Sequence, residues 1–195
     1  MDERDFFDRL APQWDANETN STPERVEEIL ALMDIRPSMS VLDLGTGTGV
    51  LLPAIAKLVG PEGKICAVDY SEGMLNLARK KFSNLLPRPH FLNLDFETET
   101  IPGEYDRIIL YCVYPHLNSP VETLKWLRKV NLRPEGEIFI AFPTDEKFIN
   151  NIHRERHSES DILPDAETLA AFLSNAGLDA VSISPEAKTY IIRIK

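Results

Sequence analysis

Hydrophobic and polar positions along this chain follow two periods, one typical of strands and one of helices. Short apolar runs predict β-strands at residues 41–44, 65–68, 90–94, 107–110, 137–142, 178–183 and 189–194. Apolar residues at helical spacing predict helices at residues 48–58, 71–85 and 120–132, with others near 23–33 and 169–176. Because strands and helices alternate, the pattern favours an α/β fold with a mostly parallel sheet. The turn at residues 184–187 is too short for a crossover, so the last two strands are expected to be antiparallel.

Two segments, residues 1–21 and 143–163, fit no strand–helix unit. We expect both near the carboxyl ends of the strands, where open α/β sheets bind ligands, and we interpret them as an N-terminal arm and a second lid. With 195 residues, of which 43% are hydrophobic and 27% charged, the chain fits a single domain over residues 1–195 with a full core.

The most informative stretch is residues 41–51, where an apolar strand runs directly into glycines at every second position. Gly45, Gly47 and Gly49 allow positive φ angles and a close approach of the backbone. Free N–H groups at the start of the following helix can then face a ligand. A nucleotide-sized ligand is therefore expected at this turn.

The spacing of these glycines separates two classes of cofactor. A dinucleotide site requires Gly-x-Gly-x-x-Gly after a wholly apolar strand, but here the spacing is Gly-x-Gly-x-Gly and Asp43 precedes the turn. That carboxylate would repel a pyrophosphate and attract the cationic S-adenosylmethionine. Asp69, 24 residues after Gly45, ends the next strand, where an acid can reach ribose hydroxyls. An NAD(P)-dependent enzyme is the weaker alternative.

Five segments then occur in a recognisable order, at residues 41–51, 67–75, 93–95, 105–111 and 132–136. Over about residues 20–195 the chain resembles the class I S-adenosylmethionine-dependent methyltransferases. Residues 6–15 are similar to the start of quinone-biosynthesis C-methyltransferases. The resemblance implies a Rossmann-like seven-stranded sheet of order 3-2-1-4-5-7-6, with strand 7 antiparallel and helices on both faces.

The resemblance also implies roles for the residues of the donor site. Asp43 would hold the ammonium group, the turn from Gly45 through Thr46 and Gly47 to Gly49 would supply backbone contacts, and Asp69 would hold the ribose. The adenine would be contacted by Tyr70, Met74, Asp95 and Phe96, and the backbone carbonyl of Tyr111 would meet the donor. Independently of the resemblance, the aromatic rings of Trp14 and Phe7 could exclude water and stabilise the sulfonium. Three structural alternatives stay open: Met74 as a core residue, Asp95 as a turn cap, and the two arm aromatics as simple packing.

The acceptor side carries weaker signals. Residues 111–116 lack the Asn/Asp-Pro-Pro-Tyr motif of enzymes that methylate DNA or protein glutamine. His116 and His153 are candidate catalytic bases, because an imidazole can remove a proton near neutral pH. His157 lies one helical turn after His153, so a three-histidine metal site is an alternative, but we predict no metal. C- or O-methylation of a small molecule is expected. Decarboxylated donor chemistry or a catalytically silent donor-binding regulatory protein are the rivals.

Charge limits the partners. The net charge is −10 and the isoelectric point is about 4.9, which disfavours nucleic acid and an anionic membrane surface. No apolar run approaches the roughly 18 residues of a membrane span, and the acidic N-terminus does not resemble a signal peptide. A cytoplasmic monomer or homodimer is expected, with Cys66 and Cys112 as buried free thiols.

Overall fold

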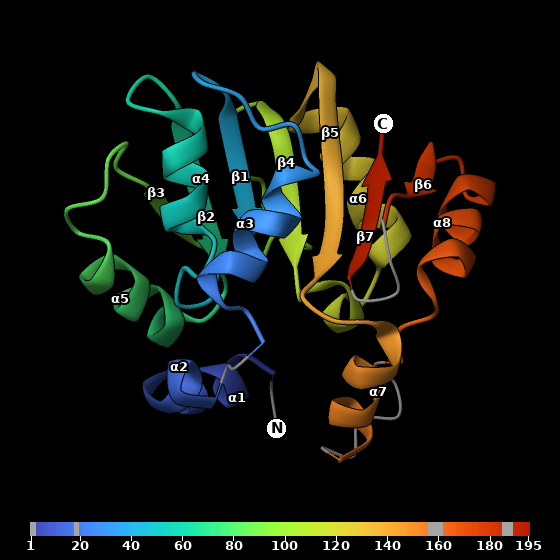
Figure 1. Cartoon of the computed structure of the whole chain (residues 1–195), viewed down its shortest axis with the longest axis horizontal. Helices are drawn as coiled ribbons and strands as arrows, with labels where there is room; N and C mark the ends of the chain where they lie inside the picture. Colours follow the sequence, from blue (N-terminus) through green and yellow to red (C-terminus); the bar gives the residue numbers. More distant parts are fainter. Residues whose placement is uncertain (1–2, 18–19, 156–161, 185–188) are drawn as a thin grey trace.

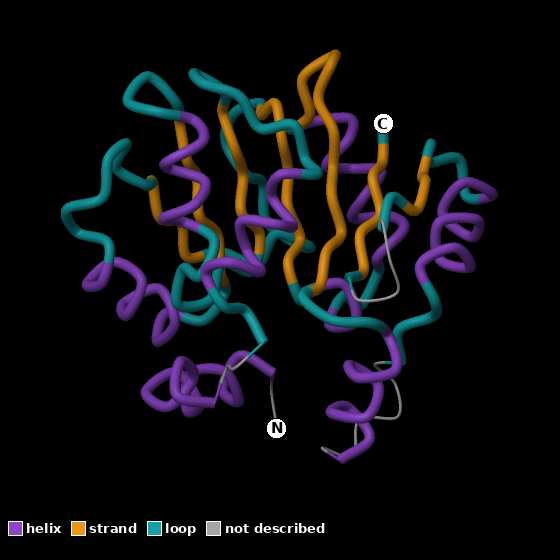
Figure 2. The backbone as a smooth tube through the Cα atoms, viewed as in Figure 1, coloured by secondary structure: helices purple, strands orange, loops and turns teal. Residues whose placement is uncertain are grey.

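The computed structural model describes residues 3–17, 20–155, 162–184 and 189–195. Its sheet has seven strands in the order β3-β2-β1-β4-β5-β7-β6, as predicted (Figures 1 and 2). Strands β1 to β5 pair with one another in parallel, whereas β7 is antiparallel to both β5 and β6. The strands are β1 Ser40–Leu44, β2 Lys64–Asp69, β3 His90–Asn93, β4 Tyr105–Tyr111, β5 Leu132–Phe142, β6 Ala180–Ser182 and β7 Tyr190–Ile194.

Helices precede, connect and flank these strands. They are α1 Glu3–Leu10, η1 Ala11–Gln13, α2 Trp14–Asn17, α3 Pro23–Ala31, α4 Leu52–Val59, α5 Glu72–Lys81, η2 Tyr114–His116, α6 Pro120–Val130, α7 Glu146–Glu155 and α8 Ala166–Asn175. The short helices η1 and η2 are of the 3₁₀ type.

The core has two halves, one on each face of the sheet. Alternate side chains of β1 divide between them: Val41 packs with α3 and α4, while Leu42 and Leu44 pack with α6 and α8. This division follows from the two-residue period of a strand. Helices on both faces therefore cover a buried sheet, as the α/β pattern predicted.

Several predicted boundaries were wrong. Helix α4 begins at Leu52 and not at residue 48, because the φ angles of Gly45, Gly47 and Gly49 are +66°, +55° and +86° and hold the turn out of helical conformation. Helix α5 ends at Lys81 and β6 is only three residues long. Phe172, one of the apolar residues whose helical spacing predicted the helix near residues 169–176, is 54% exposed. The turn at residues 185–188 lies outside the described residues.

The two leftover segments lie beyond the carboxyl ends of the parallel strands. Figure 1 shows β1, β4 and β5 pointing toward one edge, with α1 and α2 of the arm and α7 of the second segment beyond it. Neither segment is without regular structure: each forms at least one helix. Both are thus placed to cover a ligand held at that edge.

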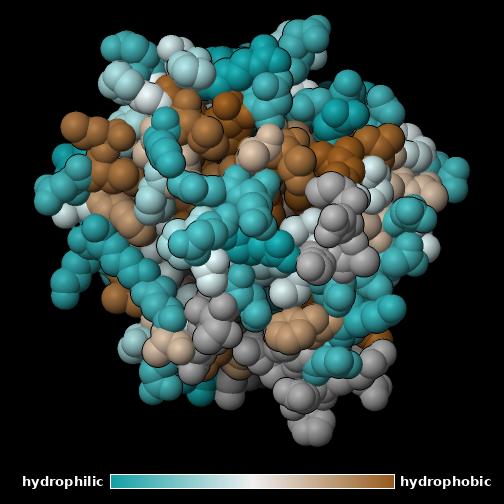
Figure 3. Space-filling model, in the orientation of Figure 1, coloured by the Kyte–Doolittle hydropathy of each residue, from teal (hydrophilic) through white to brown (hydrophobic). Residues whose placement is uncertain are grey.

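Hydrophilic residues cover much of the face seen in Figure 3, and hydrophobic ones gather in its upper half, over the sheet. Within the described ranges, no helix combines the length and the apolar character needed to cross a membrane.

Candidate functional site

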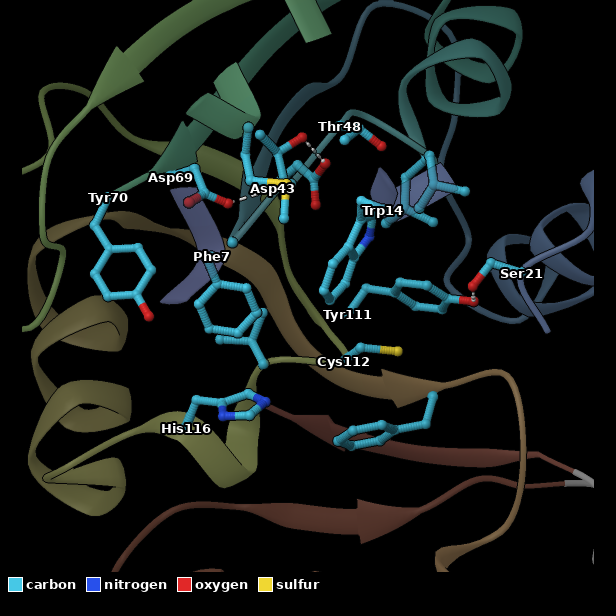
Figure 4. A pocket seen from close by; sticks show the side chains of 18 of the residues that line it. Phe7, Trp14, Ser21, Asp43, Thr48, Asp69, Tyr70, Tyr111, Cys112 and His116 are labelled. Carbon is cyan, nitrogen blue, oxygen red and sulfur yellow. Dashed lines mark hydrogen bonds between the residues drawn. The ribbon is translucent and has the colours of Figure 1, made fainter. Parts of the chain in front are cut away.

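A cavity of about 430 Å³ lies at the carboxyl ends of the strands, between the arm and the sheet (Figure 4). Its volume is in the usual range for a small-molecule site. Most of the predicted site residues line it: Trp14, Asp43, Gly45, Thr46, Gly47, Asp69, Tyr70, Met74, Asp95, Phe96, Tyr111 and His116. Gly49 is not among the described lining residues, because it faces the ring of Phe82 instead.

Two of the three glycines in the turn after β1 leave no space for a larger residue. A Cβ atom on Gly45 would lie 2.4 Å from Cγ2 of Val113, and one on Gly49 would lie 2.7 Å from Cε2 of Phe82. The turn is held to the neighbouring strand by the Thr46 N–H, which donates to the carbonyl of Val68 at 2.9 Å. Gly45, Thr46 and Gly47 line the cavity, so the backbone of the turn passes close to it just before α4.

Asp43 is the most deeply buried carboxyl group of the site, with 1% of its surface exposed. The Thr46 hydroxyl donates to its Oδ2 at 2.6 Å. Burial and, to a smaller extent, the nearby charge of Asp69 raise the pKa of Asp43 to about 7, in spite of the Thr46 hydrogen bond. A cation in the cavity would stabilise the ionised form.

Asp69 is oriented by the backbone on either side of it. The Gly47 N–H donates to its Oδ2 at 2.8 Å, and the Ser71 N–H donates to Oδ1 at 2.9 Å. Burial raises its pKa to about 6 in spite of these hydrogen bonds. Figure 4 shows Asp69 beside Asp43 at one end of the cavity. The ends of two adjacent strands thus supply a pair of buried carboxyl groups.

The arm contributes an aromatic wall. The ring of Phe7 lies 5.6 Å from those of both Trp14 and His116, and 6.1 Å from that of Tyr70, with the His116 contact nearly perpendicular. Such edge-to-face contacts are favourable. Figure 4 shows Phe7 between Tyr70 and Tyr111, above His116.

Two carboxylates that the sequence reasoning missed fasten the arm. Asp8 accepts hydrogen bonds from the Ser71 hydroxyl at 2.5 Å and the Gly73 N–H at 2.9 Å, at the start of α5. Asp15 accepts one from the Thr48 hydroxyl at 2.6 Å and pairs with Lys81 at 2.5 Å. The sequence signal that could have found Asp8 was an acidic side chain in the arm. A carboxylate is stabilised at the N-terminus of a helix, and Asp8 lies at the start of α5.

Replacing Asp8 with alanine should loosen the arm. It removes two hydrogen bonds at a helix start, a loss of about 1–3 kcal/mol. We expect faster proteolysis within residues 3–17 and weaker binding of S-adenosylhomocysteine. Asp5→Ala, at an exposed position of the same helix, is the control. Equal cleavage rates in the two variants would contradict the role of Asp8.

Asp95 caps a turn and also lines the cavity, so its contact with adenine stays a prediction. Its Oδ1 accepts from the Glu97 N–H at 3.0 Å and its Oδ2 from the Thr98 hydroxyl at 3.1 Å, so it caps a turn while it also lines the cavity. Met74 likewise is 2% exposed yet lines the cavity. The hydroxyl of Tyr111 donates to that of Ser21 at 2.9 Å and thereby joins β4 to the arm.

Glu97, also missed, joins the loop after β3 to the loop after β4. Its carboxylate accepts from the Asn118 N–H at 2.9 Å and side-chain amide at 3.0 Å, the Ser119 N–H at 2.9 Å and the Thr123 hydroxyl at 3.2 Å. Although burial opposes ionisation, these hydrogen bonds together lower its pKa. A single carboxylate thus holds the loop that carries His116.

Glu97→Gln should destabilise the protein by about 2 kcal/mol at neutral pH, because the amide nitrogen would face hydrogen-bond donors. Since the folded-state pKa is lowered, this contribution is lost as the pH falls below the ordinary glutamate range. Urea unfolding of the variant measures the loss. Asp165→Asn is the control, because Asp165 accepts from the Thr168 N–H at the start of α8, away from the cavity. Unchanged stability of the Glu97 variant would contradict the role.

The remaining predictions divide. Cys66 is buried as expected, but Cys112 is only half-buried and lines the cavity, because its φ of +59° turns the chain at the end of β4. His153 lies in α7, but its side chain is outside the described part of the structure, and His157 is outside it altogether. No group of residues suited to a metal ion occurs among the described residues.

The sheet order, the glycine turn and the paired strand-end carboxyl groups define a class I S-adenosylmethionine-dependent methyltransferase. The chain belongs to the methyltransferase domain family, whose model matches residues 35–176. The chain therefore carries the domain of the S-adenosylmethionine-dependent methyltransferases, the family that the five motifs indicated. The NAD(P)-dependent alternative is not retained.

Known relatives agree with this assignment. The chain is 30% identical over 174 residues to the ubiquinone/menaquinone biosynthesis C-methyltransferase UbiE of Bordetella parapertussis, covering 75% of this chain and 66% of the relative. It is 34% identical over 120 residues to the malonyl-[acyl-carrier protein] O-methyltransferase of Priestia megaterium, covering 62% and 40%. The chain thus spans only part of each relative. Among solved structures, the DhpI complex with S-adenosylhomocysteine shares the fold, with a TM-score of 0.77 at 16% identity and coverage of 98% and 94%.

Proposed function

We propose that this methyltransferase transfers a methyl group to a carbon or oxygen atom of a small molecule, with His116 as the base that removes the acceptor's proton. The observation that carries the proposal is that one cavity joins Asp43 and Asp69 to the imidazole of His116. The relatives include both a C-methyltransferase and an O-methyltransferase.

The residues divide into a donor side and an acceptor side. Asp43 would face the ammonium group of the donor and Asp69 its ribose hydroxyls, because ionised carboxylates bind both kinds of donor group. Phe7 and Trp14 would stabilise the sulfonium, since aromatic rings attract cations and exclude water. We assign Tyr70, Met74, Asp95 and Phe96 to the adenine.

The acceptor would lie beyond the sulfonium, toward the ends of β4 and β5. Methyl transfer is an in-line displacement, so the protein mainly orients the two reactants. Phe148 and Ile149 of α7 line this side of the cavity, which supports the second lid as part of the acceptor site. His153, on the same helix, remains our second candidate base.

Transfer of radiolabelled methyl groups from S-adenosylmethionine to a panel of phenols and activated carbon acids tests the proposal. His116→Ala should lower transfer by about 100-fold or more, the usual contribution of a general base, while leaving S-adenosylhomocysteine affinity within about two-fold. His90→Ala, at an exposed position of β3, is the control.

Three outcomes would contradict the proposal. Equal transfer by the two variants would remove His116 from the reaction. Labelling of a protein or nucleic acid in place of every small molecule would remove the small-molecule acceptor. Donor binding without any transfer would favour a regulatory protein that binds the donor.

A further inference from the structure

We infer that the acceptor is an uncharged aromatic molecule with an acidic proton, and that the site rejects acceptors carrying a carboxylate or phosphate. This inference rests on the proposed function and adds the chemical class of the acceptor. Three features of the cavity carry it: its apolar walls, its carboxylates and the surroundings of His116.

The walls on the acceptor side are apolar and contain aromatic rings. Phe142 ends β5 with 2% of its surface exposed, and its ring is held at 5.4 Å and nearly perpendicular to that of Tyr190. Val113, Leu117 and Phe148 line the same cavity. Across it, Phe7 presents the ring that contacts His116 edge-on. Walls of this kind favour a flat apolar ligand, because aromatic pairs add to the free energy of burial.

The charge of the cavity opposes anions. Asp43, Asp69, Asp95 and Glu97 all line it, and Glu97 is held in its ionised form by its hydrogen bonds. A bound donor carries two positive groups and one carboxylate, so it offsets only part of this charge. Among the lining side chains that the structure describes, only that of His116 can become positively charged. A carboxylate or phosphate would therefore enter a field of its own sign.

The surroundings of His116 suit a neutral acceptor that is deprotonated during the reaction. The acceptor's proton passes to the imidazole, and the freed electron pair attacks the methyl carbon. The bond between that carbon and sulfur breaks with its electrons on sulfur, leaving S-adenosylhomocysteine. Negative charge on the acceptor then develops beside an imidazolium only along the reaction path. The attraction between these two charges therefore stabilises the transition state more than the bound substrate, and it lowers the barrier.

Matched pairs of probes test the inference. Catechol and naphthol are neutral, and protocatechuate and hydroxynaphthoate are their carboxylated counterparts. Calorimetry with protein saturated by S-adenosylhomocysteine should show each neutral probe binding about ten-fold or more tightly than its partner, which corresponds to about 1.4 kcal/mol. Equal or tighter binding of the carboxylated probes would overturn the inference, and so would the failure of every neutral probe to bind.

A change of charge in the wall gives an independent check. Phe148 is 44% exposed, so a lysine there can be accommodated. Phe148→Lys should raise the affinity for the carboxylated probes by about ten-fold, whereas Phe148→Met, which removes the ring without adding charge, should not. Phe7→Leu should weaken neutral probes by about five-fold, with Phe172→Leu, at an exposed position of α8 outside the cavity lining, as its control. Unchanged probe selectivity in Phe148→Lys would overturn the electrostatic argument.

The failure of this inference is distinguishable from that of the proposed function. Tight S-adenosylhomocysteine binding together with methyl transfer to a carboxylated acceptor would remove only the acceptor class. Transfer confined to macromolecules would remove the proposed function itself.

Discussion

Asp69→Ala should weaken S-adenosylhomocysteine binding by about 1.5–3 kcal/mol, or roughly 10- to 150-fold, the range for a lost hydrogen bond to a charged group. The carboxylate lies at the end of β2, and the N–H groups of Gly47 and Ser71 aim it into the cavity. Two ribose hydroxyls would lose their common acceptor. Isothermal calorimetry at about pH 8, where Asp69 is ionised, measures the loss directly.

Asp106→Ala provides the matched control. Asp106 also accepts from a backbone N–H of β1, that of Ser40 at 2.7 Å, and from Arg133 at 2.8 Å, but it lies at the opposite end of the strands. Its loss should reduce stability and leave ligand affinity unchanged. Equal affinity of wild type and Asp69→Ala would remove Asp69 from the donor site.

Asp43→Asn should alter the pH dependence of stability by about 2–3 kcal/mol between about pH 5 and about pH 8. The folded-state pKa of Asp43 is raised to about 7, so the folded protein holds this proton where the unfolded chain has already released it. Stability of the ligand-free protein therefore falls as the pH rises from the ordinary aspartate range toward 7. Asparagine does not titrate, so the variant should lack this loss.

Urea unfolding of both proteins at the two pH values measures the difference. At about pH 5 Asp43 is protonated, so that measurement serves as the internal control for packing changes in the variant. Saturating S-adenosylmethionine should restore stability to wild type at about pH 8 and do much less for the variant, because the donor supplies the missing cation. If the stability of wild type and variant changed with pH in the same way, the pKa of Asp43 would not be raised in the folded protein.

The burial of Asp43 lowers the stability of the ligand-free protein. A buried carboxyl group with one hydrogen-bond partner in the protein, the Thr46 hydroxyl, destabilises the empty site. In the proposed donor complex, the ammonium group would face Asp43 and offset this unfavourable free energy. Removing the charge is expected to stabilise the ligand-free protein relative to wild type at about pH 8, while it weakens the donor complex.

That Asp43, the glycine turn and Asp69 lie together could be predicted from the sequence, because each stands at or directly after the end of a strand. Strand periodicity places Leu42 and Leu44 on one face of β1 and Val41 on the other. Asp43 and Asp69 lie close together because the adjacent parallel strands β1 and β2 have their carboxyl ends at one edge of the sheet. The glycines after β1 form the turn at this edge. The sheet order itself came from the resemblance, since the apolar pattern of each strand does not specify its neighbours.

Only the tertiary structure decided how the arm and the loops meet this edge. Asp8 contacts Ser71 across 63 residues of sequence, and Glu97 contacts Ser119 across 22. The sequence alone does not indicate which distant residue a polar side chain will contact. Phe7 and His116 meet because the arm folds back over the end of β4. Periodicity reports which face of an element is buried, whereas the pairing of distant polar groups depends on how whole elements pack, and that is a property of the folded chain alone.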